Sequence, residues 1–142
     1  MSKGEFAGRN MTKRRKRMRW LSKRWKRAKL KLWARYSVLQ GAPAGKCIVL
    51  EKKTLEQKQP HSGLIKCVKI QVVKNGRLTT AFAPRNTAIN FIDEHDEVLI
   101  EGLGGSQRGQ MGSIPGVRFK VTKVNNTDLQ MVRKGKKEKP RR

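Results

Sequence analysis

Acidic residues are scarce in this chain. Its 142 residues contain 10 Asp and Glu against 35 Lys and Arg, and the formal net charge at pH 7 is +25. Segments this basic repel themselves and need a dense external polyanion, of which nucleic acid is the most obvious. No apolar run approaches the roughly 20 residues that span a bilayer, and the first residues have no apolar signal-peptide core. We therefore expect a soluble intracellular protein rather than a membrane-spanning one.

Cysteine and histidine are also rare. The two cysteines, Cys47 and Cys67, are 20 residues apart and belong to no CxxC motif, so we expect buried free thiols rather than a zinc site. The two histidines, His61 and His95, have no nucleophile or second ligand at a recognisable spacing. The sequence therefore predicts no metal site, no catalytic residue and no enzyme activity.

The few acids are partly gathered in one run, which consists of Asp93, Glu94, Asp96 and Glu97. Paired carboxylates can serve acid–base chemistry or bind Mg²⁺, but no second ligand group stands elsewhere in the chain. We therefore expect this run to be a solvated turn between strands.

The cations are concentrated at the two ends of the chain. Residues 1–36 contain 15 Lys and Arg with one acid, and residues 133–142 contain 7 with one acid. The less charged middle can bury a small core but has no room for a deep substrate cleft. We predict a basic N-terminal extension and linker over residues 1–45, a folded domain over 46–132, and a basic C-terminal tail over 133–142.

The N-terminal extension has helical periodicity. From Thr12 to Tyr36, good helix formers surround one apolar stripe with spacings of three and four residues. The stripe consists of Met18, Leu21, Trp25, Ala28 and Leu32. We predict a helix over about residues 12–36. Its first turn is cationic, which is the wrong sign for the helix dipole, so the helix should be marginal alone in water.

A helix of this kind also fits a membrane surface, because apolar residues lie opposite cations. Trp20 and Trp33 lie off the apolar stripe, however, and the C-terminal basic run has no amphipathic face. Two separated basic segments suit a wrapped polyanion better than a flat surface. A membrane-active cationic protein is therefore the third hypothesis.

The middle of the chain has the pattern of a small β protein. Ser37–Gly45 contains Gly and Pro, so it should end the helix and act as a linker. Beyond it, short runs rich in Val and Ile alternate with turn signals, without a clear helical stretch. These runs are Cys47–Glu51, Lys66–Lys74, Leu78–Ala83, Val98–Glu101 and Val117–Val124. They predict an all-β fold, a small five-stranded barrel.

The Asn75-Gly76 pair marks a hairpin between the second and third runs. A two-residue loop would place Leu78 and Phe82 on the opposite face from the Val and Ile residues of the second run. A three-residue loop, with Gly76 in the left-handed conformation, would pair Val72 with Leu78 and Val68 with Phe82. We therefore predict this bulged loop, with Leu78 and Phe82 facing the core.

Two loops between the predicted strands have compositions suited to RNA. Gly102–Gly116 is rich in glycine, has one Arg and no acid, and matches neither a P-loop nor GxGxxG. Lys58–Lys66 places a proline and small polar residues between cations. Such loops can bring backbone and small donors close to phosphates and ribose 2′-hydroxyls, although their composition alone is equally typical of plain turns.

These loops and their surroundings resemble the family of the universal small-subunit ribosomal protein numbered twelve in bacteria and twenty-three in eukaryotes. The similarity covers nearly the whole chain. GEFAGR near the start and GAP at Gly41–Pro43 are more similar to the archaeal or eukaryotic branch. The other matching stretches are IVLEK at Ile48–Lys52, KQPHS at Lys58–Ser62, KNG at Lys74–Gly76, NFIDEHDEV at Asn90–Val98, IPGVRFKV at Ile114–Val121 and KGKKEKPRR at the C-terminus.

The resemblance implies an OB-type five-stranded barrel at the decoding centre of the small subunit, in the cytoplasm. Its implied partners are small-subunit rRNA and neighbouring ribosomal proteins, with aminoacyl-site tRNA and mRNA nearby. In the family, one loop approaches the rRNA bases that inspect the codon–anticodon helix, and a second loop lies close to the same rRNA. The decoding-centre contacts carried over to this chain are Pro60, His61, Ser62 and Gly63, and Gly112, Ser113, Ile114, Pro115 and Gly116.

Four residues depart from the family pattern. His61 stands where the family usually has Asn, Gly63 where it has Ala, Ile65 where it has Arg, and Ser113 where it has Asp. An imidazole cannot present the donor and acceptor pair of an amide, so the decoding contacts of this chain should differ in detail. Pro60 matches a proline that is hydroxylated in eukaryotic members and is the candidate modification site.

Charge and resemblance together predict a structural rRNA-binding protein that supports accurate tRNA selection. We expect no cofactor other than structural Mg²⁺ held through the rRNA. A free-standing OB-type protein that binds single-stranded nucleic acid is the alternative. Such proteins stack bases on aromatic residues, however, and the middle of this chain offers only Phe82, Phe91 and Phe119. The cations expected to contact rRNA phosphates are Lys13, Arg14, Arg15, Lys16, Arg17, Arg19, Lys58, Lys66, Lys69, Arg118, Lys120, Arg133, Lys134, Lys136 and Lys137.

Overall fold

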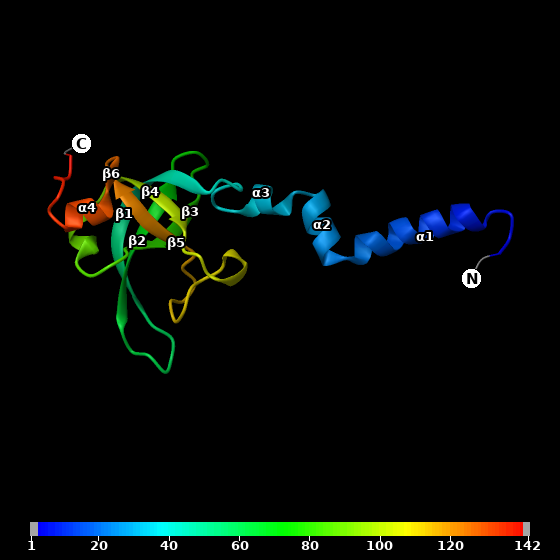
Figure 1. Cartoon of the computed structure of the whole chain (residues 1–142), viewed down its shortest axis with the longest axis horizontal. Helices are drawn as coiled ribbons and strands as arrows, with labels where there is room; N and C mark the ends of the chain where they lie inside the picture. Colours follow the sequence, from blue (N-terminus) through cyan, green and yellow to red (C-terminus); the bar gives the residue numbers. More distant parts are fainter. Residues whose placement is uncertain (1–2, 141–142) are drawn as a thin grey trace. The chain divides into compact units, whose positions relative to one another are not determined.

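The computed structural model describes residues 3–140 and divides the chain into two compact units (Figure 1). The boundary falls between Gly41 and Ala42. Helices form the N-terminal unit, and the strands lie in the C-terminal unit. The first two residues of the predicted extension and the last two of the predicted tail lie outside the described residues.

Three helices, rather than one, form the N-terminal unit: α1 (Ala7–Leu21), α2 (Lys23–Lys29) and α3 (Leu32–Tyr36). The first break is at Ser22, whose hydroxyl accepts a hydrogen bond from the Trp25 N–H at 3.4 Å and so caps α2. The second break is at Lys31, which has a left-handed backbone with φ of 48°. The predicted continuity is therefore wrong, because a serine inside a periodic pattern competes as a helix cap.

The apolar stripe of the N-terminal unit is not covered. Among the described residues, none in α1, α2 or α3 is buried, and Met18 and Leu21 are 57% and 68% exposed. Helices of this length are marginal in water without packing, so we expect this unit to depend on a partner surface. No helix within residues 3–140 has the length and apolar composition needed to cross a bilayer.

The strands form one sheet in the spatial order β3-β2-β1-β4-β5-β6. Neighbours in this order are antiparallel, and β3 also pairs with β5 in parallel, which closes β1 to β5 into a ring. We call these five strands the strand ring. The bounds are β1 (Ala44–Glu56), β2 (Leu64–Val72), β3 (Leu78–Phe82), β4 (Glu97–Gly102), β5 (Phe119–Val124) and β6 (Thr127–Asp128), with η1 (Ala88–Phe91), η2 (Ser106–Arg108) and α4 (Leu129–Arg133) between or after them.

The five predicted runs correspond to β1–β5, but β1 is longer and four elements are new, namely η1, η2, β6 and α4. β1 begins inside the predicted linker, because Ala44 already pairs with Glu101 of β4. The sequence also predicts neither β6 nor α4. The Asp128 carboxylate caps α4 by accepting hydrogen bonds from the Gln130 and Met131 N–H groups at 2.8 and 3.2 Å. An Asp before a short apolar run was the available signal for this helix.

Branched aliphatic residues fill the interior of the strand ring. Residues from each of its strands except β3 are fully buried with bulky side chains, namely Val49, Val68, Ile70, Val98, Ile100 and Val121. Cys47 and Cys67 are buried free thiols, as predicted. Burial raises the pKa of the Cys47 thiol to about 12 and that of Cys67 to about 11.

The hairpin between β2 and β3 has a different register from the predicted one. Val68 pairs with Ala81 and Gln71 with Leu78, while the Val72 N–H donates to the Arg77 carbonyl at 3.0 Å. Gly76 is left-handed as predicted, with φ of 67°, but the three-residue loop is wrong. The loop holds residues 73–76, so Ala81 stands opposite buried Val68 and is buried, whereas Leu78 stands opposite exposed Gln71 and is 57% exposed.

Candidate nucleic-acid interface

Two loops extend from the strand ring side by side. The first joins β1 to β2 and contains Pro60, His61, Ser62 and Gly63, all exposed, after a cis Gln59–Pro60 peptide bond. The second joins β4 to β5 and contains residues 112–116. Figure 1 shows the tip of the β1–β2 hairpin and the yellow β4–β5 loop on the same side of the ring. The structure thus brings together the two groups of residues that the sequence assigns to one RNA site.

Ser113 is the point at which the two loops are joined. The Gln57 side-chain amide donates to the Ser113 hydroxyl at 2.8 Å, and the Lys58 N–H donates to the Ser113 carbonyl at 3.2 Å. The Gln57 N–H also donates to the Gly63 carbonyl at 3.0 Å, which closes the base of the first loop. We call the contact between the Gln57 amide and the Ser113 hydroxyl the Gln57 bridge. Sequence reasoning missed Gln57, whose only signal was its place directly before the KQPHS motif.

Glycine at position 63 leaves the space that the Gln57 bridge occupies. A Cβ atom at Gly63 would overlap the Gln57 side-chain oxygen. If that oxygen moved away, the nitrogen of the same amide would leave the Ser113 hydroxyl. Gly63 and Ser113, two of the four departures from the family pattern, therefore belong to one local arrangement around Gln57.

The other two departures have different surroundings. His61 lies in a tight turn, in which its N–H donates to the Lys58 carbonyl at 3.0 Å, and its side chain is exposed. Ile65 lies within β2 and pairs with Leu55 of β1. An apolar residue at position 65 therefore supports the ladder of the hairpin, whereas His61 presents its imidazole to solvent.

The predicted phosphate-contacting cations differ in their surroundings. Those on α1 are all exposed, and so are Lys58, Lys66 and Arg118 around the two loops. Lys69 instead faces Glu51 at 3.3 Å, so part of its charge is neutralised within the chain. Lys120 of β5 and Arg133 of α4 are half-buried, and the exposed cations of the tail are Lys134, Lys136 and Lys137.

The acidic run at residues 93–97 is a turn before β4 with Asp93 and Glu94 exposed, as the sequence predicts, but Asp96 within it is not solvated. Asp96 is 7% exposed, and it accepts hydrogen bonds from the Asp93 N–H at 2.7 Å and the Asn125 amide at 3.0 Å. The Lys139 ammonium of the C-terminal tail lies 2.5 Å from a carboxylate oxygen of Asp93 and of Asp96. Local composition does not reveal these contacts, because Lys139 is 46 residues from Asp93 in the sequence.

The ion pairs with Lys139 alter the acidity of their members. The pKa of Asp93 is lowered, chiefly by the hydrogen bond from Lys139. Burial would lower the pKa of Lys139, but its hydrogen bonds to Asp93 and Asp96 outweigh burial and raise it. The acidic run therefore holds the tail against the C-terminal unit. Within residues 3–140, no group of His, Cys, Asp and Glu is arranged to hold a metal ion.

A strand ring with two joined loops and numerous exposed cations defines a small, strongly basic β protein. Comparison with known families then identifies the kind of protein: the chain belongs to the family described as Ribosomal protein S12/S23, which matches residues 32–142. It is therefore a ribosomal protein of the small subunit, part of the ribonucleoprotein that carries out translation. The match confirms the resemblance seen in the sequence, and it begins at Leu32, after α1 and α2.

Proposed function

We propose that this chain is an OB-type barrel protein of the archaeal or eukaryotic branch that binds rRNA at the decoding centre and supports accurate tRNA selection. The observation that carries the proposal is the Gln57 bridge, because it joins the exposed residues 60–63 to the partly exposed residues 112–116. Exposed Lys58 and Lys66 flank these residues. Small polar groups and backbone beside cations suit the shallow groove of RNA, where ribose hydroxyls are displayed.

The mechanism is positional, and no bond is made or broken. The cations of α1 and of the tail neutralise rRNA phosphates, and the strand ring docks as a rigid body. Pro60 to Gly63 and Gly112 to Gly116 then limit how adjacent nucleotides move near the aminoacyl-site tRNA and mRNA. The His61 imidazole and Ser62 hydroxyl supply hydrogen-bonding groups at the tip of the first loop. Structural Mg²⁺ would be held through the rRNA rather than by the chain.

Sedimentation of a cell lysate tests the class of function. We expect the protein to travel with small subunits and complete ribosomes of the cytoplasm. If most of it ran as a light species, the alternative of a free-standing protein for single-stranded nucleic acid would replace the proposal. Recovery with membranes would instead favour the membrane-active hypothesis.

Misreading reporters test the decoding role separately. His61→Ala and Ser62→Ala should change misreading, or the response to miscoding drugs, more than they change the yield of subunits. Lys53→Ala is the matched control, because Lys53 is exposed on the same hairpin but lies in the β1–β2 ladder rather than in the loop. Unchanged fidelity in both loop variants would contradict the role assigned to the loop.

Pro60 is the proposed hydroxylation site. It is exposed at the start of the loop tip, where a modifying enzyme can reach it. Mass spectrometry of the peptide that contains Pro60, from ribosomes of the native host, should show one added oxygen. An unmodified peptide throughout growth would reject the modification without affecting the decoding proposal.

A further inference from the structure

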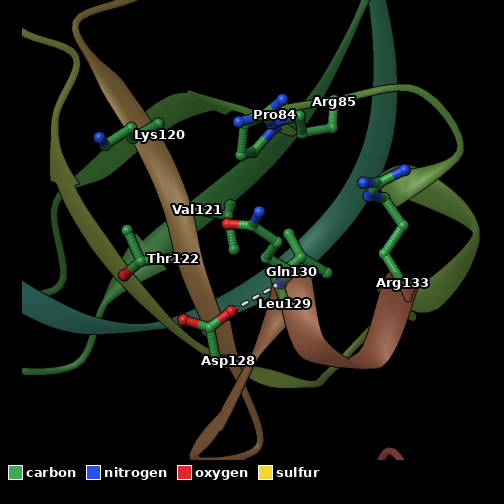
Figure 2. Close-up of a pocket in the computed structure, with 9 residues that line it drawn as sticks. All are labelled: Pro84, Arg85, Lys120, Val121, Thr122, Asp128, Leu129, Gln130 and Arg133. Atoms are coloured by element: carbon green, nitrogen blue, oxygen red, sulfur yellow. Dashed lines mark hydrogen bonds between the residues drawn. The ribbon is translucent and has the colours of Figure 1, made fainter. Parts of the chain in front are cut away.

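A pocket in the C-terminal unit lies between α4, β5 and the segment that follows β3 (Figure 2). Its volume is about 300 Å³, at the small end of the range for ligand sites in proteins. None of the loop residues at 57–63 or 112–116 lines it, so it is separate from the loop interface. The residues that line it are Pro84, Arg85, Lys120, Val121, Thr122, Asp128, Leu129, Gln130 and Arg133.

Three cations from three elements line this pocket. Arg85 follows β3, Lys120 lies in β5, and Arg133 ends α4. Arg133 is half-buried, and its Nε is buried without a hydrogen-bond partner among the described residues. A buried N–H without a partner costs free energy, which an anionic oxygen in the pocket would offset. The arrangement therefore favours an anionic ligand.

The remaining walls indicate that the anion carries a flat apolar group. Pro84 supplies the apolar surface of the pocket, because the side chains of Val121 and Leu129 are 0% and 2% exposed and lie in the core. In Figure 2, Asp128 lies on the opposite side of the pocket from Arg85 and Lys120. The Oδ1 atom of Asp128 accepts the two hydrogen bonds that cap α4. The Oδ2 atom takes no part in that cap. A carboxylate only accepts hydrogen bonds, so it favours an amino group and repels a second anion.

We propose that this pocket binds a single RNA nucleotide. Its phosphate contacts Arg85, Lys120 and Arg133, its base packs on Pro84, and an exocyclic amino group of the base donates to Asp128. An acidic peptide would satisfy the cations but would be repelled by Asp128, so the observations favour RNA. The inference rests on the proposed function for the identity of the RNA, and it adds a second contact independent of the decoding loops.

Photocrosslinking in assembled small subunits tests the proposal directly. Gln130→p-benzoylphenylalanine places a photoreactive group at the exposed rim of the pocket. The same replacement at Lys123, exposed on β5 but not part of the pocket lining, is the matched control. We expect the position 130 probe to label one rRNA nucleotide. Arg133→Met in the same chain should lower that yield by about tenfold, whereas Lys74→Met, at an exposed lysine outside the pocket lining, should leave it unchanged.

Crosslinks from position 130 to protein, no RNA crosslink, or an RNA crosslink insensitive to Arg133→Met would each overturn the pocket proposal. None of these outcomes bears on the decoding loops. If the chain were absent from small subunits, sedimentation would show it, and the proposed function would fail instead. The pocket would then be tested on the isolated chain.

That second experiment uses NMR of the full-length chain with adenosine 5′-monophosphate, inorganic phosphate, adenosine and N-acetylglutamate as probes. We expect the nucleotide to shift the Arg133 side-chain N–H signal at the lowest concentration. Arg133→Met and Lys120→Met should each weaken nucleotide binding by about tenfold, while Lys74→Met and Lys123→Met, at exposed lysines outside the pocket lining, should not. If Arg133→Met unfolds the chain, Lys120→Met carries the test. Equal binding of nucleotide and N-acetylglutamate, or equal effects of all four substitutions, would refute the nucleotide site.

Discussion

At the scale of single residues, Gly63 decides how the two loops meet. A Cβ there would overlap the Gln57 oxygen, so Gly63→Ala should displace the amide from Ser113, as Gln57→Ala removes it. We expect each substitution to lower the free energy of unfolding by roughly 1 kcal/mol, measured with urea. The double variant should be little worse than either, because both remove one contact.

Gly102→Ala is the matched control for Gly63→Ala, since a Cβ at Gly102 meets no atom within 4 Å. It also corrects for the entropy that any Gly→Ala change removes from the unfolded chain. Fully additive losses for Gly63→Ala and Gln57→Ala would show that Gly63 does not act through the Gln57 bridge.

The two thiols give a second prediction at this scale. Burial raises the pKa of Cys47 to about 12 and of Cys67 to about 11, so both stay protonated at pH 8. Because only the thiolate is alkylated, iodoacetamide should react at least roughly 100-fold more slowly with the folded chain than with the chain in guanidinium. Mass spectrometry over time measures both rates. Rapid labelling of either thiol under native conditions would contradict the burial.

At the scale of elements, the acidic run and the C-terminal tail form one assembly. Lys139→Met should free the tail, seen as faster amide exchange at residues 138 and 139. Lys137→Met is the control, because the Lys137 side chain is exposed. The acidic run should also become more exposed to solvent in the Lys139 variant alone. Equal exchange in the two variants would contradict the attachment.

The same attachment should depend on pH at both ends of the scale. The pKa of Asp93 in the folded chain is lowered from 3.8. Its contribution to the stability of the tail attachment is therefore complete above pH 3.8 and is lost as the pH falls through the folded pKa. The folded pKa of Lys139 is raised from 10.5, so its contribution is complete below pH 10.5 and is lost as the pH rises through the folded pKa. We therefore compare amide exchange at residues 138 and 139 with exchange at the same residues in Lys139→Met. The slowing in the unaltered chain should be greatest between these two pH limits.

At the scale of the whole molecule, charge should govern affinity for rRNA. The logarithm of the binding constant should fall with the logarithm of salt by about 0.7 to 0.9 per phosphate contact. Deleting residues 1–36, which include 15 Lys and Arg, should reduce that slope by the amount expected for several phosphate contacts. The deletion should chiefly impair assembly of the small subunit. The single change Lys123→Met should reduce it by at most one contact. A slope unaffected by the deletion would show that α1–α3 do not lie on RNA.

The strands were predictable because their residues alternate, and the register of β3 was not. Val68 and Ile70 are buried as their apolar character requires. Whether Leu78 or Ala81 faces the core depended on the length of the loop before β3, which sets the residues that pair with Val68 and Gln71. In the site, the motif residues Pro60 to Ser62 are visible in the sequence. Gln57 is not, because its contact with Ser113 spans 56 residues.

The sequence alone determines the sign of the partner's charge, the order of the strands along the chain and the family. Charge, periodicity and motifs are all properties of residues along the chain. The closure of the strand ring, the Gln57 bridge, the Lys139 ion pairs and the nucleotide pocket depend on tertiary structure. Each joins residues that are distant in sequence, and their distances exist only after the ring has closed. Hydrogen bonds and ion pairs act over a few ångströms, so no local pattern could reveal them.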